Sequence, residues 1–339
     1  MRAILPWVAV LGFAMLAQVA VGPVVGHYWT KILMDVGIAV LLAVSLNIVN
    51  GFTGQFSIGH AGFMAVGGYT AGILTYYGGA ALFDLPPGAV APGIAGHLWF
   101  ALSTLVGGVV AAVAGVVVGL PSLRLRGDYL AIVTLGFGEI MRVLLTRTED
   151  VIGSAEELAT APWTTQVVST GGSLGFTGLP FYTNLFWTWL WTGIAILVAY
   201  RLKESSTGRA MLSVREDEVA SGAMGVRTTD VKVIAFAMAA LFAGIAGGLF
   251  AHEIGTTLNP AELGFQKSFE IVIMVVLGGM GSVTGAALAA TILTIVPELL
   301  REFSEYRMIV YAALLVVVML VRPTGLLGHR EIWHAWRRS

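Results

Sequence analysis

A Gly-rich segment near residue 50 carries the side chains best suited to contact a polar solute. Seven Gly lie between residues 51 and 72, and each lowers helix stability by about 0.8–1.0 kcal/mol relative to Ala. The segment therefore predicts a broken helix, which a membrane tolerates only where the break is buried in protein or lines water. The candidate residues of a solute path are Asn47, Asn50, Gly54, Gln55, Ser57, Gly59 and His60.

This segment has three interpretations. Its amide, hydroxyl and imidazole groups can bind a zwitterionic solute, or they can satisfy the backbone groups that the break sets free. In a third interpretation, the Gly residues only permit close packing between helices. The sequence leaves these alternatives open.

Glu139 and Arg142 are a charged pair within an otherwise apolar run. Their spacing of three residues places both on one face of a helix, where they can form an ion pair. A lone charge at the centre of a bilayer costs about 2.5–3.5 kcal/mol on insertion scales. We therefore interpret Glu139 and Arg142 as a structural ion pair that fixes this helix in a bundle, in preference to a substrate contact.

Residues 208–225 mix charged and apolar residues and are too short and too charged to span a membrane. The pattern predicts short amphipathic helices that end at Gly225. Such helices can lie on lipid headgroups or dock into a groove of a soluble partner. In the second case we expect apolar contacts from Met211, Val214 and Ala220. The candidate coupling residues are Arg209, Met211, Val214, Arg215, Glu216, Asp217, Glu218, Ala220 and Gly225.

No motif for nucleotide or thiolate chemistry accompanies these segments. A P-loop needs Gly-Lys followed by Ser or Thr, and Gln266 stands before Lys267, which is the only Lys that precedes a Ser. The chain has no Cys, which excludes a thiolate nucleophile or a thiolate metal site. It also has no HExxH motif. We expect a pathway that is not an enzyme and that holds neither a metal nor a cofactor of its own.

Ten apolar runs predict the helices that position these segments. With 57% hydrophobic and 12% charged residues, against about 25% charged in soluble domains, the chain cannot cover a surface that faces water. A membrane span needs about 20 apolar residues. We predict an all-α, polytopic bundle of about ten spans, forming one permease domain over residues 1–339. The runs lie at 4–22, 32–50, 57–77, 97–120, 128–146, 184–200, 231–250, 268–281, 283–299 and 307–321.

Two further patterns concern how these helices are arranged. A second Gly-rich break at 278–282 mirrors the first, and paired breaks in two halves of a chain point to an inverted repeat. The GxxxG pairs Gly244/Gly248 and Gly281/Gly285 favour close helix contact. The first run is longer than the 7–15 residue core of a signal peptide, so we expect it to be retained as a span.

The basic residues predict an orientation. If the N-terminus is inside and the ten runs alternate, the inner side holds 13 and the outer side 6 of the 19 Lys and Arg, as the positive-inside rule requires. Both termini are then cytoplasmic. Residues 202–230 form a cytoplasmic coupling loop, and residues 147–183 form a periplasmic loop.

The sequence resembles the LivM-type permease subunit of ABC importers for branched-chain amino acids. The similarity extends from about residue 33 to 328 and is carried by residues 51–63, 124–139, 208–225, 278–281 and 322–328. Glu218, Ala220 and Gly225 are similar to the Glu-Ala-Ala…Gly signature of importer permeases, from which Val219 and Ser221 depart.

The resemblance implies a multi-pass protein of the bacterial inner membrane that works with several partners. These are a LivH-type second permease, two cytoplasmic ATPases of the LivG and LivF types that bind the ATP, and a periplasmic solute-binding protein. It also implies that residues 208–225 dock on an ATPase, and it implies no nucleic-acid partner.

Two alternatives stay open at this point. Related permeases carry urea, short amides or other small polar solutes, and no residue in this sequence identifies the solute. An alternative of another class is a secondary carrier or channel that works alone. Neighbouring genes for two ATPases and a binding protein would favour the importer.

Overall fold

The regular structure of the chain is helical. The computed structural model describes residues 5–122, 128–253, 257–303, 307–322, 324–328 and 331–332. Within these ranges there is no β-strand, only the isolated bridges Glu149–Ser169 and Phe176–Leu258. The predicted all-α fold is confirmed. The start of the 124–139 motif and part of the 322–328 motif lie outside the described residues.

The α-helices follow one another along the chain with short π and 3-10 turns between them. The α-helices are α1 Leu5–Leu16, α2 Gly22–Asn47, α3 His60–Ile73, α4 Gly79–Phe83, α5 Gly93–Ser122, α6 Asp128–Thr146, α7 Ala155–Thr160, α8 Trp163–Val168, α9 Leu185–Glu204, α10 Ser206–Glu216, α11 Glu218–Ala223, α12 Thr228–Ala251, α13 Phe265–Gly278, α14 Val283–Leu299 and α15 Arg307–Val321. The π turns are η1 Ala17–Val21, η2 Ile48–Phe52 and η3 Leu74–Gly78, and the 3-10 turns are η4 Gly172–Leu174, η5 Pro260–Leu263 and η6 Leu300–Phe303.

Five segments of the described chain are long and apolar enough to cross a membrane. They are Val24–Phe52, Gly93–Pro121, Tyr129–Thr146, Leu185–Glu204 and Thr228–Ala251, and Leu5–Val21 and Val283–Leu299 are shorter apolar helices. Two of the expected spans are short because α3 begins after one Gly-rich break and α13 ends at the other. The figure of about ten spans therefore stays a prediction.

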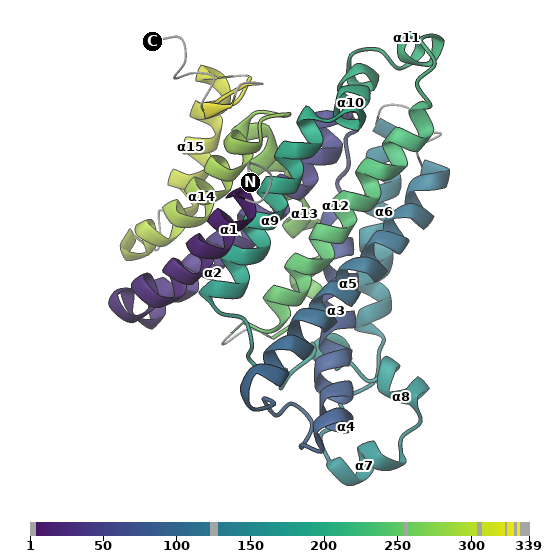
Figure 1. Ribbon diagram of the computed structural model, residues 1–339, viewed down its shortest axis with the longest axis vertical. Helices are drawn as coiled ribbons and strands as arrows, with labels where there is room; N and C mark the ends of the chain where they lie inside the picture. The colour runs from purple at the N-terminus through teal and green to yellow at the C-terminus, as the bar shows by residue number, and fades with distance from the viewer. Residues whose placement is uncertain are drawn as a thin grey trace.

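The long helices run side by side (Figure 1), with α10 and α11 at one end of the bundle and α4, α7 and α8 at the other. We call these the α10 end and the α8 end. Helix α12 is central and contacts α2, α3 and α5. Helix α14 packs on α2 and α13, while α9 packs on α1 and α2. The polar segments from 51 to 59 and from 278 to 282 are thereby held inside one bundle.

Helices α3, α5 and α12 touch through Gly residues. A Cβ atom at Gly67 of α3 would overlap the backbone of Gly244 in α12, and one at Gly107 of α5 would lie 2.5 Å from the Gly67 carbonyl oxygen. A Cβ at Gly248 would lie 2.9 Å from the Thr104 side chain of α5. The predicted close contact at Gly244 and Gly248 is confirmed.

The second predicted GxxxG pair does not lie on one helix. Gly281 precedes α14 and has a φ of +92°, whereas Gly285 lies within α14 and packs against the Gly278 carbonyl. This prediction is wrong because Gly281 belongs to a turn, where its conformational freedom and not its size is used.

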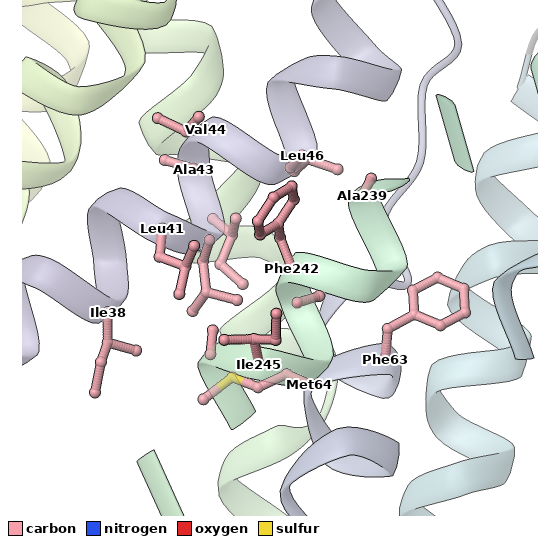
Figure 2. Close-up of a cluster of buried hydrophobic side chains, with 14 of the residues drawn as sticks. Ile38, Leu41, Ala43, Val44, Leu46, Phe63, Met64, Ala239, Phe242 and Ile245 are labelled. Atoms are coloured by element: carbon pink, nitrogen blue, oxygen red, sulfur yellow. The ribbon is translucent and has the colours of Figure 1, made fainter. Parts of the chain in front are cut away.

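A hydrophobic cluster fills the space between α2, α3 and α12. Figure 2 shows Phe242 of α12 directed toward Leu46 of α2, while Phe63 points from α3 away from that contact. The Phe63 ring lies 4.9 Å from the ring of Phe137 in α6. Apolar contacts therefore run from α2 through α12 and α3 to α6. This core surrounds the first Gly-rich break.

Candidate functional site

The first break lies between α2 and α3. Helix α2 passes into the π turn η2, and residues 53–59 are not helical before α3 begins at His60. Gly54 has a φ of +68°, in the left-handed region that Gly adopts without strain. The break expected from the Gly content is therefore present.

Asn47 joins the first break to the second. Its Oδ1 accepts a hydrogen bond from the Gly281 amide at 2.8 Å, and its Nδ2 donates to the Ser282 carbonyl at 3.0 Å. A Cβ atom at Gly51 would overlap the Gly281 amide nitrogen. The two breaks that the sequence pairs are thus in contact, and the inverted repeat itself stays a prediction.

Most of the candidate polar side chains bind backbone or side chains of this chain. Asn50 Oδ1 accepts from the Ser57 amide at 3.2 Å and Asn50 Nδ2 donates to the Ser57 carbonyl at 3.4 Å. His60 Nε2 lies 2.8 Å from Ser45 Oγ. Gln55 differs from them: the residue is 8% exposed, and its buried Oε1 has no hydrogen-bond partner within the described part of the chain. Gln55 is therefore the candidate with an acceptor left for another ligand.

Gly59 and Gly62 serve as a contact between helices. A Cβ at Gly59 would overlap the carbonyl oxygen of Thr134 in α6, and one at Gly62 would lie 2.8 Å from the Cα of Gly138. The Ile58 amide also donates to Thr134 Oγ1 at 3.1 Å. At these two Gly residues the geometry favours the packing interpretation, so a Leu at Gly59 would disturb α6 before it tested a solute path.

Helix α10 lies directly against both breaks. Arg215 Nη1 donates to the Gly51 carbonyl at 2.8 Å and to the Met280 carbonyl at 3.4 Å. A Cβ at Gly54 would lie 2.9 Å from Arg215 Cγ. One guanidinium therefore connects the segment 202–230 to the two Gly-rich turns.

The apolar side chains available to a partner differ from those expected. Met211 and Val214 are buried within this chain, whereas Val219 is 69% and Met224 is 85% exposed on and after α11. Met211 and Val214 therefore do not present an exposed apolar surface to a partner, because the face of α10 that carries them packs on the bundle. Ala220 is exposed, as expected.

The ends of α10 and α11 follow the local rules. Asp217 caps α11 by accepting from the amides of Val219 and Ala220. Gly225, with a φ of +89°, follows α11, and the Val226 amide returns to the Ser221 carbonyl at 3.0 Å, which confirms the predicted helix end. The remaining charged candidates lie near the surface: Arg209 donates to the Glu204 carbonyl at 2.9 Å, Glu218 pairs with Lys232 at 2.5 Å, and Glu216 is exposed.

Lys203 and Glu331 form a clamp that sequence analysis missed. Lys203 Nζ donates to Glu331 Oε1 at 2.5 Å and to the Gly281 carbonyl at 2.6 Å. The Glu331 carboxylate also accepts from the amides of Val283 and Thr284, at the start of α14. Burial raises the pKa of Glu331, but the hydrogen bonds from Lys203 and Thr284 outweigh it and hold that pKa below its usual value. No local sequence signal links residues 128 positions apart.

The predicted pairing of Glu139 and Arg142 is present, with Arg142 Nε 2.7 Å from Glu139 Oε2. The other carboxylate oxygen of Glu139 accepts from the Phe265 amide at 2.9 Å. This pair therefore also caps the first turn of α13, where a negative charge is favoured. It fixes α6 to α13 at the α8 end.

The chain is similar to transport permeases over most of its length. A family model described as "Branched-chain amino acid transport system / permease component" matches residues 28–319. The high-affinity branched-chain amino acid transport system permease protein LivM of Salmonella typhimurium is 36% identical over 306 residues, which cover 86% of this chain and 68% of the relative. The LivM protein of Escherichia coli gives the same identity and coverage. The LivH protein of Escherichia coli is 35% identical over 147 residues, 42% of this chain and 47% of that protein. No solved structure matches.

Proposed function

The chain belongs to the family of permease components of branched-chain amino acid transport systems, and we propose that it is the LivM-type permease subunit of an ABC importer. Its apolar helices and its family make it a membrane protein. In this role it carries branched-chain amino acids across the bacterial inner membrane. The relatives are transport permeases, not enzymes.

The contact between α10 and both breaks is the observation that carries this proposal. An importer must convert ATP hydrolysis in a soluble subunit into movement of helices within the membrane. Arg215 bonds to the carbonyl of Gly51 in one break and to that of Met280 in the other. A push on α10 would thereby reach both discontinuous helices at once.

The proposed partners follow from the family and from the surfaces of this chain. Similarity to LivH over 147 residues supports a LivH-type subunit as the second permease. LivG-type and LivF-type ATPases would dock at the α10 end, and a periplasmic binding protein would deliver the solute at the α8 end. We propose that the ATPases bind the ATP and that this chain binds no cofactor.

One short match to an enzyme motif does not carry a second function. Residues 171–175 fit GxSxG, which hydrolases place on a turn between a strand and a helix. Here Ser173 is exposed on η4, and no strand precedes it among the described residues. We propose no catalytic activity for this chain.

Transport by the reconstituted complex tests the proposal. Proteoliposomes that contain both permeases and both ATPases should take up leucine when ATP is inside and loaded binding protein is outside. Uptake of urea or a short amide in place of leucine would overturn the assignment of solute. Leucine uptake by this chain without the ATPases would identify a stand-alone carrier.

The proposed orientation places residues 202–230 in the cytoplasm and residues 147–183 in the periplasm. The native chain has no Cys, so single Cys residues report their side of the membrane without background. Cys at Ser173 should react with an impermeant maleimide in intact spheroplasts, and Cys at Met224 only after the membrane is opened; both positions are exposed. The reverse pattern would contradict the orientation.

The exposed apolar residues after α10 should bind the ATPase. Met224→Asp places a charge on a side chain that is 85% exposed, and a lost interface anchor costs about 2 kcal/mol or more. We expect at least a tenfold loss of the ATP hydrolysis stimulated by loaded binding protein. Met224→Leu and Glu216→Gln should stay within twofold of wild type. Full stimulation in Met224→Asp would mean that the ATPase docks elsewhere.

A further inference from the structure

A cleft with charged walls and an apolar floor lies between α2, α13 and α14. Its volume is about 370 Å³, within the range of about 300–1,000 Å³ for small-molecule sites. Its charged lining residues are Asp35, Lys267, Glu270 and Glu298, and its apolar lining includes Ile38, Leu42 and Met64. The asymmetry suits a ligand that is charged at one end and aliphatic at the other.

The order of these residues along the helices gives the cleft a direction. Helices α2 and α13 both run toward the α10 end, because Asn47 at the end of α2 bonds to Gly281 just beyond α13. Asp35 precedes Leu42 on α2, and Lys267 lies in the first turn of α13. The charges therefore face the α8 end, and the apolar floor lies deeper.

The charged groups of this cleft and its surroundings form ion pairs, among them Glu298 with Arg301 at 3.2 Å. Lys31 Nζ lies 3.7 Å from Asp35 Oδ2 and 3.4 Å from Glu253 Oε1, while Lys267 Nζ lies 3.4 Å from Glu270 Oε2. Glu253 is fully buried, and among the described residues neither of its carboxylate oxygens accepts a hydrogen bond. Asp35, Glu270 and Glu298 thus line the cleft together with the ammonium of Lys267, so a ligand that carries both an ammonium and a carboxylate meets groups of opposite sign there.

We propose that this cleft binds the zwitterion of an aliphatic α-amino acid on its way through the permease, a site that rests on the proposed function. Lys267 pairs with the ligand carboxylate, and Asp35 and Glu270 pair with its ammonium. The aliphatic side chain lies on the apolar floor. A solute without both charged groups cannot replace the ion pairs that Lys267 and Asp35 make with Glu270 and Lys31, so the cleft selects amino acids over urea or amides.

The cleft leads toward the first break. One helical turn beyond Leu42 and Met64 stand Ser45 and His60, whose side chains are hydrogen-bonded at 2.8 Å. This contact lies next to the apolar lining residues, at the level where α3 begins. Movement of the break would separate Ser45 from His60 and open the way to the α10 end.

Photolabelling of the full complex locates the site without a mutation. Photo-leucine, a leucine analogue with a diazirine in its side chain, is supplied on the binding protein under turnover, and labelled peptides are mapped by mass spectrometry. We expect the label on peptides that contain lining residues of the cleft, in the segments 32–42, 64, 271–274 or 293–294. Label confined to other segments, or to the second permease, would overturn the proposal.

Variants test the assigned charges. Lys267→Met should lower leucine uptake at least tenfold and remove the label, while Lys267→Arg keeps at least half of both. Arg147→Met, which removes an exposed cation outside the cleft, should match wild type. Unchanged uptake and label in Lys267→Met would overturn the site alone, because wild-type uptake of leucine would still support the proposed function. A wild-type complex that takes up no branched-chain amino acid would refute both.

Discussion

Gly247→Ala should prevent α12 from packing on α3, although it adds a single methyl group. The Cβ atom would overlap the Met64 carbonyl oxygen and lie 2.8 Å from the Gly68 amide nitrogen. Both are backbone atoms of α3, so no side chain can turn aside. Overpacking typically costs 1–3 kcal/mol and occasionally more, which exceeds the roughly 0.8–1.0 kcal/mol that Ala gains over Gly in a helix. Because the opposing atoms are backbone, we expect a cost at the upper end of that range and a net loss of about 2 kcal/mol.

Thermal unfolding in detergent, followed by the fluorescence of the nine Trp, measures this loss. The matched control is Gly136→Ala in α6, where a Cβ meets nothing within 4 Å. The control should unfold at or slightly above the wild-type temperature, and Gly247→Ala well below it. Equal unfolding temperatures for the two variants would mean that α3 and α12 do not pack through these Gly residues.

Arg215→Ala should uncouple ATP hydrolysis from uptake. The variant loses the donors to the carbonyls of Gly51 and Met280, and an unsatisfied buried polar group costs about 1–3 kcal/mol. A loss of that size at the link between α10 and the breaks corresponds to a fall in uptake of roughly 5- to 150-fold. Arg215→Lys should be intermediate, because one ammonium cannot reproduce the fork of a guanidinium.

Uptake and stimulated ATP hydrolysis are measured together in proteoliposomes, with the unfolding temperature as a check on folding. The control is Arg209→Ala on the same helix, whose guanidinium donates only locally, to the Glu204 carbonyl. We expect Arg209→Ala to transport within twofold of wild type. Wild-type uptake by Arg215→Ala would show that α10 does not act on the breaks.

The features that sequence analysis predicted correctly are local ones. Gly near residue 54 favours a break because it needs no partner elsewhere to adopt a positive φ. The end of α11 at Gly225 and the pairing of Glu139 with Arg142 depend on residues within one or two helical turns. The membrane-spanning character follows from composition, since a chain with 12% charged residues cannot cover itself with polar surface.

Tertiary structure decided which groups these local features meet. Asn47 bonds to the Gly281 turn, and Met211 and Val214 are buried against the bundle, because the helix that lies alongside determines which face is buried. Lys203 meets Glu331 across 128 residues, and Asp35 and Lys267 line the same cleft only because α2 and α13 lie beside it. Such contacts depend on how helices far apart in the chain pack together. Hydrophobic burial drives that packing, and because it is non-directional it leaves no mark at any single position of the sequence.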